Sequence, residues 1–161
     1  MKFTGAEATK EKFLRSFENV DVIHFAGHYV ANLQSPANSK LLFAGSELRS
    51  SELSTHRLNQ PRLIVLSACQ TGYEVYNRSE GAIGIARTFL AVGVPVVIAS
   101  QWQVDSGPTK DLMIAVHRNR TRKGMSSVES LRQAQLAMRS SEKSAPFYWA
   151  AFSLFGGYTS Y

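Results

Sequence analysis

The chain has 161 residues, 44% of them hydrophobic, and a single cysteine, which is typical of one globular domain, and we expect residues 1–161 to form it. A domain of this size buries enough apolar surface to fold without a disulfide or structural metal, and the lone Cys69 excludes a disulfide framework. The longest apolar run, residues 89–99, has 11 residues and is too short to cross a membrane. The first 20 residues contain several lysines and no apolar signal segment, so we expect a reducing, cytoplasmic setting.

Lysine and arginine exceed aspartate and glutamate by 18 to 12, which gives a net charge of +6. The densest basic cluster is Arg118, Arg120, Arg122 and Lys123. No aromatic residue for base stacking is interleaved with it, and it lies where a predicted helix ends, a place at which cations complement the helix dipole. The cluster therefore predicts a solvated helix end, and we expect no direct binding of nucleic acid.

Apolar runs rich in β-branched residues alternate with helical patterns along the chain. In chain order, the predicted elements are a helix over residues 8–18, a strand over 20–26, a hairpin over 41–49 with its turn at 44–46, a strand over 63–68, a helix over 80–92, a strand over 94–100, helices over 108–119 and 127–140, and a strand over 148–155. This alternation predicts an α/β fold with a doubly wound, mostly parallel sheet.

Capping residues and glycines set the predicted helix boundaries. They are Ser106 or Thr109 for the helix that Pro108 opens, Ser126 or Ser127 for the following helix, and Gly93 and Gly124 as helix stops. Two irregular polar segments, residues 32–39 and 73–79, each follow the carboxyl end of a predicted strand. Ligands bind at this edge of an open α/β sheet.

His28 and Cys69 are the candidate catalytic pair. His28 follows the first predicted strand, and Cys69 follows the second one, 41 residues later. If those strands are neighbours, which places them about 4.8 Å apart, both side chains reach one carbonyl carbon between them. This is the arrangement of a thiol nucleophile and its base, and the sequence separation is close to that of caspases.

The same residues have alternative interpretations. A single cysteine considered without its neighbours is interpreted as an inert buried thiol, but the polar residues that follow Cys69 indicate a surface position. His24 lies inside the strand and is interpreted as a hydrogen-bonded core or supporting histidine. The spacing of His24 and His28 resembles a zinc motif, but no glutamate lies between them and they follow a strand, so no metal is expected. The usual signatures of nucleotide binding and serine hydrolysis are absent from the sequence.

Several motifs together resemble the CHAT domains, caspase-like modules in the clan of caspases, separases and gingipains. The motifs are Ala8-Thr9-Lys10, His24-Phe25-Ala26-Gly27-His28, Leu66-Ser67-Ala68-Cys69-Gln70-Thr71-Gly72, Glu80-Gly81 with Ala86-Arg87 and Phe89-Leu90, Ser100-Gln101-Trp102-Gln103-Val104-Asp105, and Tyr148-Trp149-Ala150-Ala151-Phe152. They extend along nearly the whole chain. The resemblance implies a three-layer α/β/α sandwich.

The resemblance also assigns roles to particular residues. It implies a cysteine endopeptidase in which His28 and Cys69 form the catalytic dyad, with no cofactor. The backbone N–H groups of Tyr29 and Cys69 would hold the oxyanion, although the family typically has glycine at the position of Tyr29. Asp105 resembles the acid that selects a basic residue before the cut in separases, and its alternative role is to cap the helix that opens at Pro108. In the family an aspartate pair is usual there, and this chain has Asp105-Ser106.

The resemblance further implies that two strands of the full fold are missing. The strand that contains His24 would then be an exposed sheet edge, covered by upstream residues of a longer protein or by a second copy of the chain. Family members are usually attached to tetratricopeptide repeats, so a repeat-containing region or partner protein is expected to regulate cleavage of protein substrates. The alternative function is a non-catalytic CHAT-like module for protein interaction or signalling.

Overall fold

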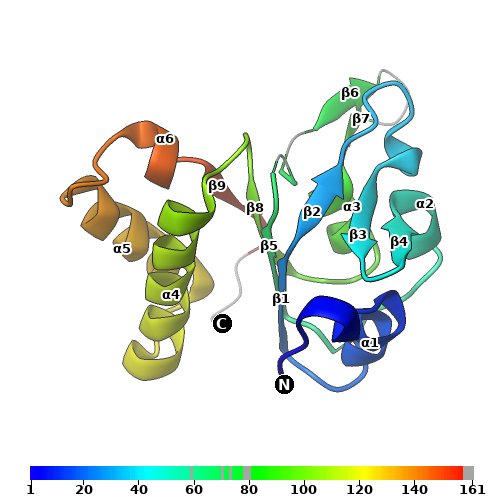
Figure 1. The fold of residues 1–161 in the computed structure, drawn as a ribbon, viewed down its shortest axis with the longest axis horizontal. Coiled ribbons are helices and arrows are strands. Elements are labelled where there is room, and N and C mark those ends of the chain that lie inside the picture. The colour runs from blue at the N-terminus through cyan, green and yellow to red at the C-terminus, as the bar shows by residue number, and fades with distance from the viewer. Residues whose placement is uncertain (59, 70, 73, 78–80, 158–161) are drawn as a thin grey trace.

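The computed structural model describes residues 1–58, 60–69, 71–72, 74–77 and 81–157. Its main sheet has four strands in the order β1-β5-β8-β9, and Figure 1 shows helices on both sides of it. The strands are β1 (Val22–Ala26), β5 (Leu63–Ser67), β8 (Val96–Ser100) and β9 (Phe152–Gly156). The first three are parallel to one another, and β9 is antiparallel to β8. The mixed α/β architecture with a mostly parallel sheet is therefore confirmed.

Side chains of the central strands alternate between two apolar cores. In β5, Ile64 and Leu66 belong to one core, whereas Leu63 and Val65 belong to the other. This alternation follows from the two-residue repeat of a strand, and it explains why a doubly covered strand reads as a continuous apolar run. Hydrophobic burial on both faces thus holds β5 in the middle of the molecule.

Helices form the outer layers. On the face of the first core lie α1 (Lys10–Ser16) and α3 (Ile85–Ala91), together with the four-residue α2 (Ser50–Leu53). On the opposite face α4 (Ser106–Lys123) packs along α5 (Ser127–Arg139), beside the short α6 (Pro146–Trp149). Short 3₁₀ turns occupy Gly5–Glu7 and Pro36–Asn38.

The predicted hairpin is part of a second, three-stranded sheet. Strands β3 (Lys40–Phe43) and β4 (Ser46–Arg49) pair across a turn at Ala44 and Gly45, as expected. Strand β2 (His28–Val30) joins them by antiparallel pairing with β3, which the sequence did not predict. A further hairpin is formed by β6 (Val75–Asn77) and β7 (Gly81–Ile83).

Several helix boundaries agree with the sequence prediction. The Ser126 hydroxyl accepts from the backbone N–H of Glu129, so Ser126 caps α5. Gly124 ends α4 with φ 63°, a left-handed conformation that favours glycine. Gly93 follows α3 with φ 114°, and a Cβ there would approach the carbonyl oxygen of Leu58 to 2.7 Å.

Other boundaries were predicted wrongly. Helix α4 begins at Ser106 and α3 begins at Ile85, after β7. Ser106 and Thr109 therefore lie inside α4 and do not cap it. Pro108 is tolerated as the third residue of α4, since the first N–H groups of a helix need no partner within the helix. The predicted helix start at Glu80 lies outside the described residues.

The predicted final strand is shorter than expected. Its first residues form α6, which begins at Pro146 and ends at Trp149. The indole N–H of Trp149 donates to the backbone oxygen of Ser144, and that of Trp102 donates to the oxygen of Phe147. A short aromatic run does not distinguish a buried strand from a helical turn, so the pattern alone placed the strand too early.

Within the described part of the chain, no helix combines the length and apolar character needed to cross a membrane.

Candidate active site

The pairing of β1 with β5 places the two candidate catalytic residues at one edge of the main sheet. The two strands are parallel neighbours, and their last paired residues are Ala26 and Ser67. His28 lies two positions beyond Ala26, and Cys69 lies two positions beyond Ser67. Both residues therefore leave the sheet at its carboxyl edge and at the same level along the strands, as the sequence predicted.

His28 is not in a loop, because it begins strand β2 and pairs with Leu42 of β3. The residues of β2 alternate, with His28 and Val30 exposed and Tyr29 partly buried. The exposed imidazole thus lies on the face of β2 opposite to the Tyr29 ring. Gly27 connects β1 to β2, and a Cβ at this position would come within 2.7 Å of the Phe25 ring.

The Tyr29 ring packs against the first core. Burial raises the pKa of its phenol, while the Ser39 hydroxyl and the backbone of Ile85 act in the opposite direction. The side chain that stands where the family has glycine is therefore directed into the protein. Because Tyr29 belongs to a strand, its backbone is extended and needs no left-handed conformation.

Buried hydroxyl groups fix the turn that bears Cys69. Thr71 Oγ1 lies 3.0 Å from the carbonyl oxygen of Leu66 and 3.1 Å from that of Ala68. It accepts from the backbone N–H of Ser100 at 3.1 Å, and the Ser100 hydroxyl donates to the oxygen of Ala68 at 2.5 Å. The end of β8 thereby holds the end of β5 in place, because both hydroxyl groups contact the carbonyl oxygen of Ala68, the residue before Cys69.

Cys69 is a free, partly buried thiol. No hydrogen bond between Cys69 and His28 is present in the described structure, although catalytic contacts of this kind often tighten only when substrate binds. Gln70, Tyr73 and residues 78–80 adjoin this site in the sequence and lie outside the described residues, so that residues 74–77 are the described part of the polar segment 73–79. The strand geometry thus places an imidazole and a thiol at one edge of the sheet.

Asp105 occupies the N-cap position of α4 but does not act as a side-chain cap. Its backbone oxygen accepts from the N–H of Thr109 at 3.1 Å, whereas its carboxylate makes no capping hydrogen bond. The residue is exposed, five positions after the end of β8. Its carboxylate therefore remains available at the carboxyl edge of the same sheet.

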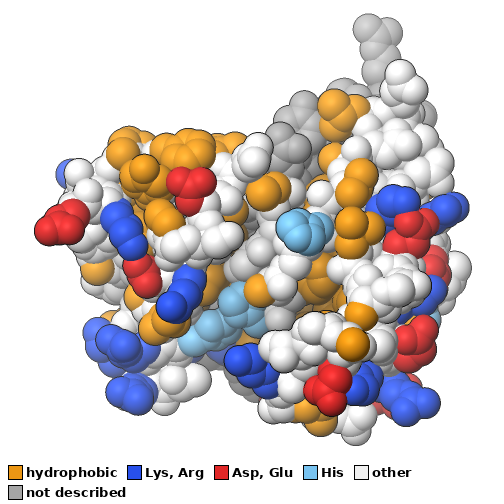
Figure 2. Space-filling model, viewed as in Figure 1, with side chains coloured by type: hydrophobic (Ala, Val, Ile, Leu, Met, Phe, Trp, Pro, Cys, Tyr) orange, Lys and Arg blue, Asp and Glu red, His pale blue; other side chains and the backbone are white. Residues whose placement is uncertain are grey.

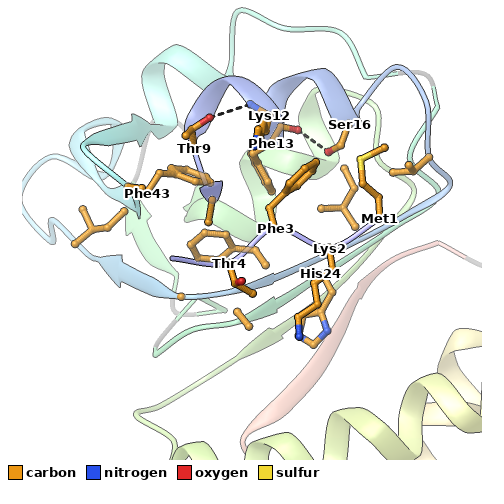
Figure 3. Close-up of a pocket in the computed structure, with 18 of the residues that line it drawn as sticks. Met1, Lys2, Phe3, Thr4, Thr9, Lys12, Phe13, Ser16, His24 and Phe43 are labelled. Atoms are coloured by element: carbon orange, nitrogen blue, oxygen red, sulfur yellow. Dashed lines mark hydrogen bonds between the residues drawn. The ribbon is translucent and has the colours of Figure 1, made fainter. Parts of the chain in front are cut away.

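A cavity of about 850 Å³ runs along β1 and is shown in Figure 3. Its walls come from residues 1–4, α1, β1 and the turn between β3 and β4. His24 and His28 line it, but Cys69 does not. The cavity is thus not centred on the thiol, and the strand register is what brings His28 and Cys69 to one sheet edge. No cluster of three metal-ligating side chains occurs among the described residues.

A second polar cluster joins β1, β5 and α4. His24 Nε2 lies 2.7 Å from Ser67 Oγ, and His24 Nδ1 lies 3.0 Å from His117 Nε2. Burial and the neighbouring His117 lower the pKa of His24 to about 4, and burial followed by the charge of Arg120 lowers the pKa of His117. His24 is exposed at the edge of the sheet, so a place in the core, one of its two expected roles, is wrong, whereas its hydrogen bonds fit the supporting role.

Sequence reasoning missed the roles of Ser67, Thr71, Ser100 and His117. A polar residue at the end of an otherwise apolar strand was the available signal for Ser67 and Ser100. Nothing in the local sequence connects His117 with His24, because the two residues are 93 positions apart.

Comparison with known proteins supports the motif-based resemblance. The family model described as CHAT domain matches residues 2–157. Tetratricopeptide repeat protein 28 of Mus musculus is 26% identical over 193 aligned residues, and the human protein of the same name is 25% identical over 190. Each alignment covers 94% of this chain and 8% of the relative. The chain therefore corresponds to a small part of these long repeat proteins.

Proposed function

The chain belongs to the CHAT domain family, and we propose that it is a cysteine endopeptidase with His28 and Cys69 as its catalytic dyad. The observation that carries this proposal is the β1–β5 register, which brings an exposed imidazole and a free thiol to the same sheet edge. Membership of this family relates the chain to the superfamily of caspase-like peptidases. The dyad and its activity are our inference.

The proposed reaction proceeds through a covalent acyl-enzyme. The Cys69 sulfur, as a thiolate, attacks the scissile carbonyl carbon, and its bond to that carbon forms as the carbonyl becomes an oxyanion. His28 donates a proton to the leaving amine as the C–N bond breaks. His28 then takes a proton from water, which attacks the thioester and releases the acid product, and this step restores the Cys69 thiolate and the protonated His28. No metal or organic cofactor takes part.

Backbone N–H groups of Tyr29 and Cys69 are proposed to hold the oxyanion. The inward direction of the Tyr29 ring supports this role, because the bulk of the side chain is placed in the core. The hydrogen bonds of Thr71 and Ser100 support it as well, since they fix the backbone immediately before Cys69. Preorganised donors of this kind stabilise the transition state without rearrangement.

We further propose that a repeat-containing region or partner regulates the cleavage of selected proteins. The support is that both relatives are named as tetratricopeptide repeat proteins and that the aligned part is 8% of their length. The present chain would then be one CHAT domain, the C-terminal part of a larger domain or protein. A reducing compartment such as the cytoplasm would keep the Cys69 thiol free.

Labelling with an electrophilic peptide tests the dyad directly. The wild-type chain should form a covalent adduct at Cys69, located by mass spectrometry of digested protein, whereas Cys69→Ala should form none. His28→Ala should react far more slowly, because the thiolate loses its partner. His56→Ala, which alters a histidine three residues after α2, is the matched control and should react like the wild type.

Adduct formation that is unchanged by His28→Ala would contradict the dyad. A thiol that resists the probe in the folded wild type would favour the alternative, a non-catalytic module for protein interaction. Circular dichroism of each variant confirms that the fold is retained, so loss of labelling is not confused with unfolding.

Asp105 is proposed to select a basic residue immediately before the cut. Its carboxylate is exposed at the carboxyl edge of β8 and has no capping hydrogen bond that would occupy it. Asp105→Ala should reduce cleavage after arginine by about 10- to 100-fold, as expected for loss of one charge-assisted contact. Glu142→Ala removes an exposed carboxylate after α5 and should leave cleavage unchanged. Cleavage after Asp or Glu by the wild type would contradict this specificity.

A further inference from the structure

Arg120 on α4 is a half-buried cation that lacks an internal partner. Its Nε atom is buried and has no hydrogen-bond acceptor, and the described structure gives its guanidinium no ion pair. Burial lowers the pKa of this group, which means that its charge is held at a cost. Buried donors without a partner are rare in folded proteins, so the position of Arg120 calls for an explanation.

Arg120 adjoins a chain of polar side chains that begins with His117. His117 lies one helical turn before Arg120, close enough for the two to influence each other electrostatically. His117 Nε2 is 3.0 Å from His24 Nδ1, and Ser67 Oγ is 2.7 Å from His24 Nε2. Among the described groups that shift the pKa of either histidine, none is a carboxylate. No described carboxylate therefore balances the charge of Arg120 in this cluster.

The same cluster is open to solvent beside β1. The described residues that line the cavity along β1 include none of α4, so access to the cluster does not pass through that cavity. His24 is exposed, and Figure 3 shows Lys2 beside it. Figure 2 shows histidine side chains in the hollow between the two halves of the molecule. A small ligand can therefore reach the cluster.

We propose that the groove between β1 and α4 binds a phosphate-type oxyanion. Arg120 and Lys2 would supply positive charge, and His117 and Ser67 would supply hydrogen bonds. Phosphate oxygens are strong acceptors whose geometry matches the N–H groups of a planar guanidinium. This site is separate from the proposed reaction at Cys69, so either function stands without the other.

Calorimetric titration of the full chain with inorganic pyrophosphate in low-salt buffer tests the site. Arg120→Gln should weaken binding by about 10-fold or more, because it removes a charge-assisted contact from a partly desolvated position. Arg122→Gln removes the same charge from an exposed position on the last turn of α4 and should change affinity less than about 2-fold, since exposed charges are screened. Equal weakening by the two variants, or no binding by the wild type, would overturn the proposal.

A second measurement avoids substitution. Pyrophosphate added to the wild type should shift the imidazole NMR signals of His24 and His117 and leave those of His56 unchanged. Shifts of similar size at all three histidines would contradict a defined site. Cys69→Ala should bind pyrophosphate like the wild type, so failure of the peptidase proposal does not affect this one.

Two further binding experiments test how affinity depends on pH and identify the source of the oxyanion. Sulfate keeps its charge between pH 7.5 and 5.5, and its affinity should rise over that range because a bound anion favours protonation of His24 and His117, which face Ser67, Lys2 and Arg120. An affinity that falls with decreasing pH would count against the site. Tighter binding of phenyl phosphate than of inorganic phosphate would identify a ligand with an apolar part in the groove, and equal binding would identify the free ion.

Discussion

At the scale of single residues, the surroundings of His24 determine the protonation state of its ring. Both of its ring nitrogens have side-chain partners, Ser67 and His117. The surrounding protein and the second imidazole lower its pKa to about 4, although part of the side chain is exposed to solvent. The ring is therefore neutral at pH 7. In the unfolded chain a histidine titrates near its ordinary pKa of about 6.5.

This difference predicts acid sensitivity. Because the folded pKa is the lower one, stability is complete above pH 6.5 and falls as the pH decreases toward 4, where the unfolded chain binds the proton first. Urea unfolding at pH 7.5 and pH 5.0 should show a larger loss for the wild type than for His24→Gln, which keeps hydrogen-bonding groups but does not titrate. His56→Gln should lose as much as the wild type. An identical loss in His24→Gln and the wild type would contradict the assignment.

At the scale of elements, the two long helices on one face of the sheet begin in different ways. Helix α5 has a side-chain cap at Ser126, whereas α4 has Asp105 at the same position with no side-chain hydrogen bond. A capping hydroxyl satisfies one of the free N–H groups of the first turn, and its removal leaves that group to water. The two helix starts should therefore respond differently to alanine.

Ser126→Ala should lower the free energy of unfolding by about 0.5–2 kcal/mol. Asp105→Ala should change it by less than about 0.5 kcal/mol, the usual range for an exposed side chain without a specific contact. Chemical denaturation of both variants measures the difference. A larger loss for Asp105→Ala than for Ser126→Ala would show that its carboxylate caps α4 in solution, and it would weaken the proposed role of Asp105 in substrate selection.

The elements that could be predicted from sequence are those whose signal is local. The strands around Val65 and Ile98 were found because continuous apolar runs identify strands buried on both faces. Strand β2 was not found, because three residues with a pairing partner elsewhere have no periodicity to detect. The places of His28 and Cys69 at one edge were predictable, since each follows a strand directly. The contact between His24 and His117 depends on how α4 crosses the sheet, which no local pattern encodes.

At the scale of the whole molecule, β1 forms an edge of the main sheet. One side of its backbone pairs with β5, and no described strand pairs with the other side. Ile23 and Phe25 are buried in the first core, and this burial fixes the position of β1 at the edge of the sheet. The strand contains no lysine, glutamate or proline, the residues that usually prevent an edge from pairing with another chain. The open edge is thus suited to the addition of a strand.

This edge predicts association between copies of the chain when no other segment covers it. Sedimentation velocity at increasing protein concentration should show a rising dimer fraction, because edge pairing satisfies backbone groups that otherwise face water. Ala26→Lys places a charge at the exposed end of β1 and should shift association to higher concentration. Ala37→Lys adds the same charge at an exposed position in the 3₁₀ turn after β2 and should associate like the wild type. A species that remains monomeric at every concentration, or equal weakening by both variants, would show that β1 is not the surface through which copies meet.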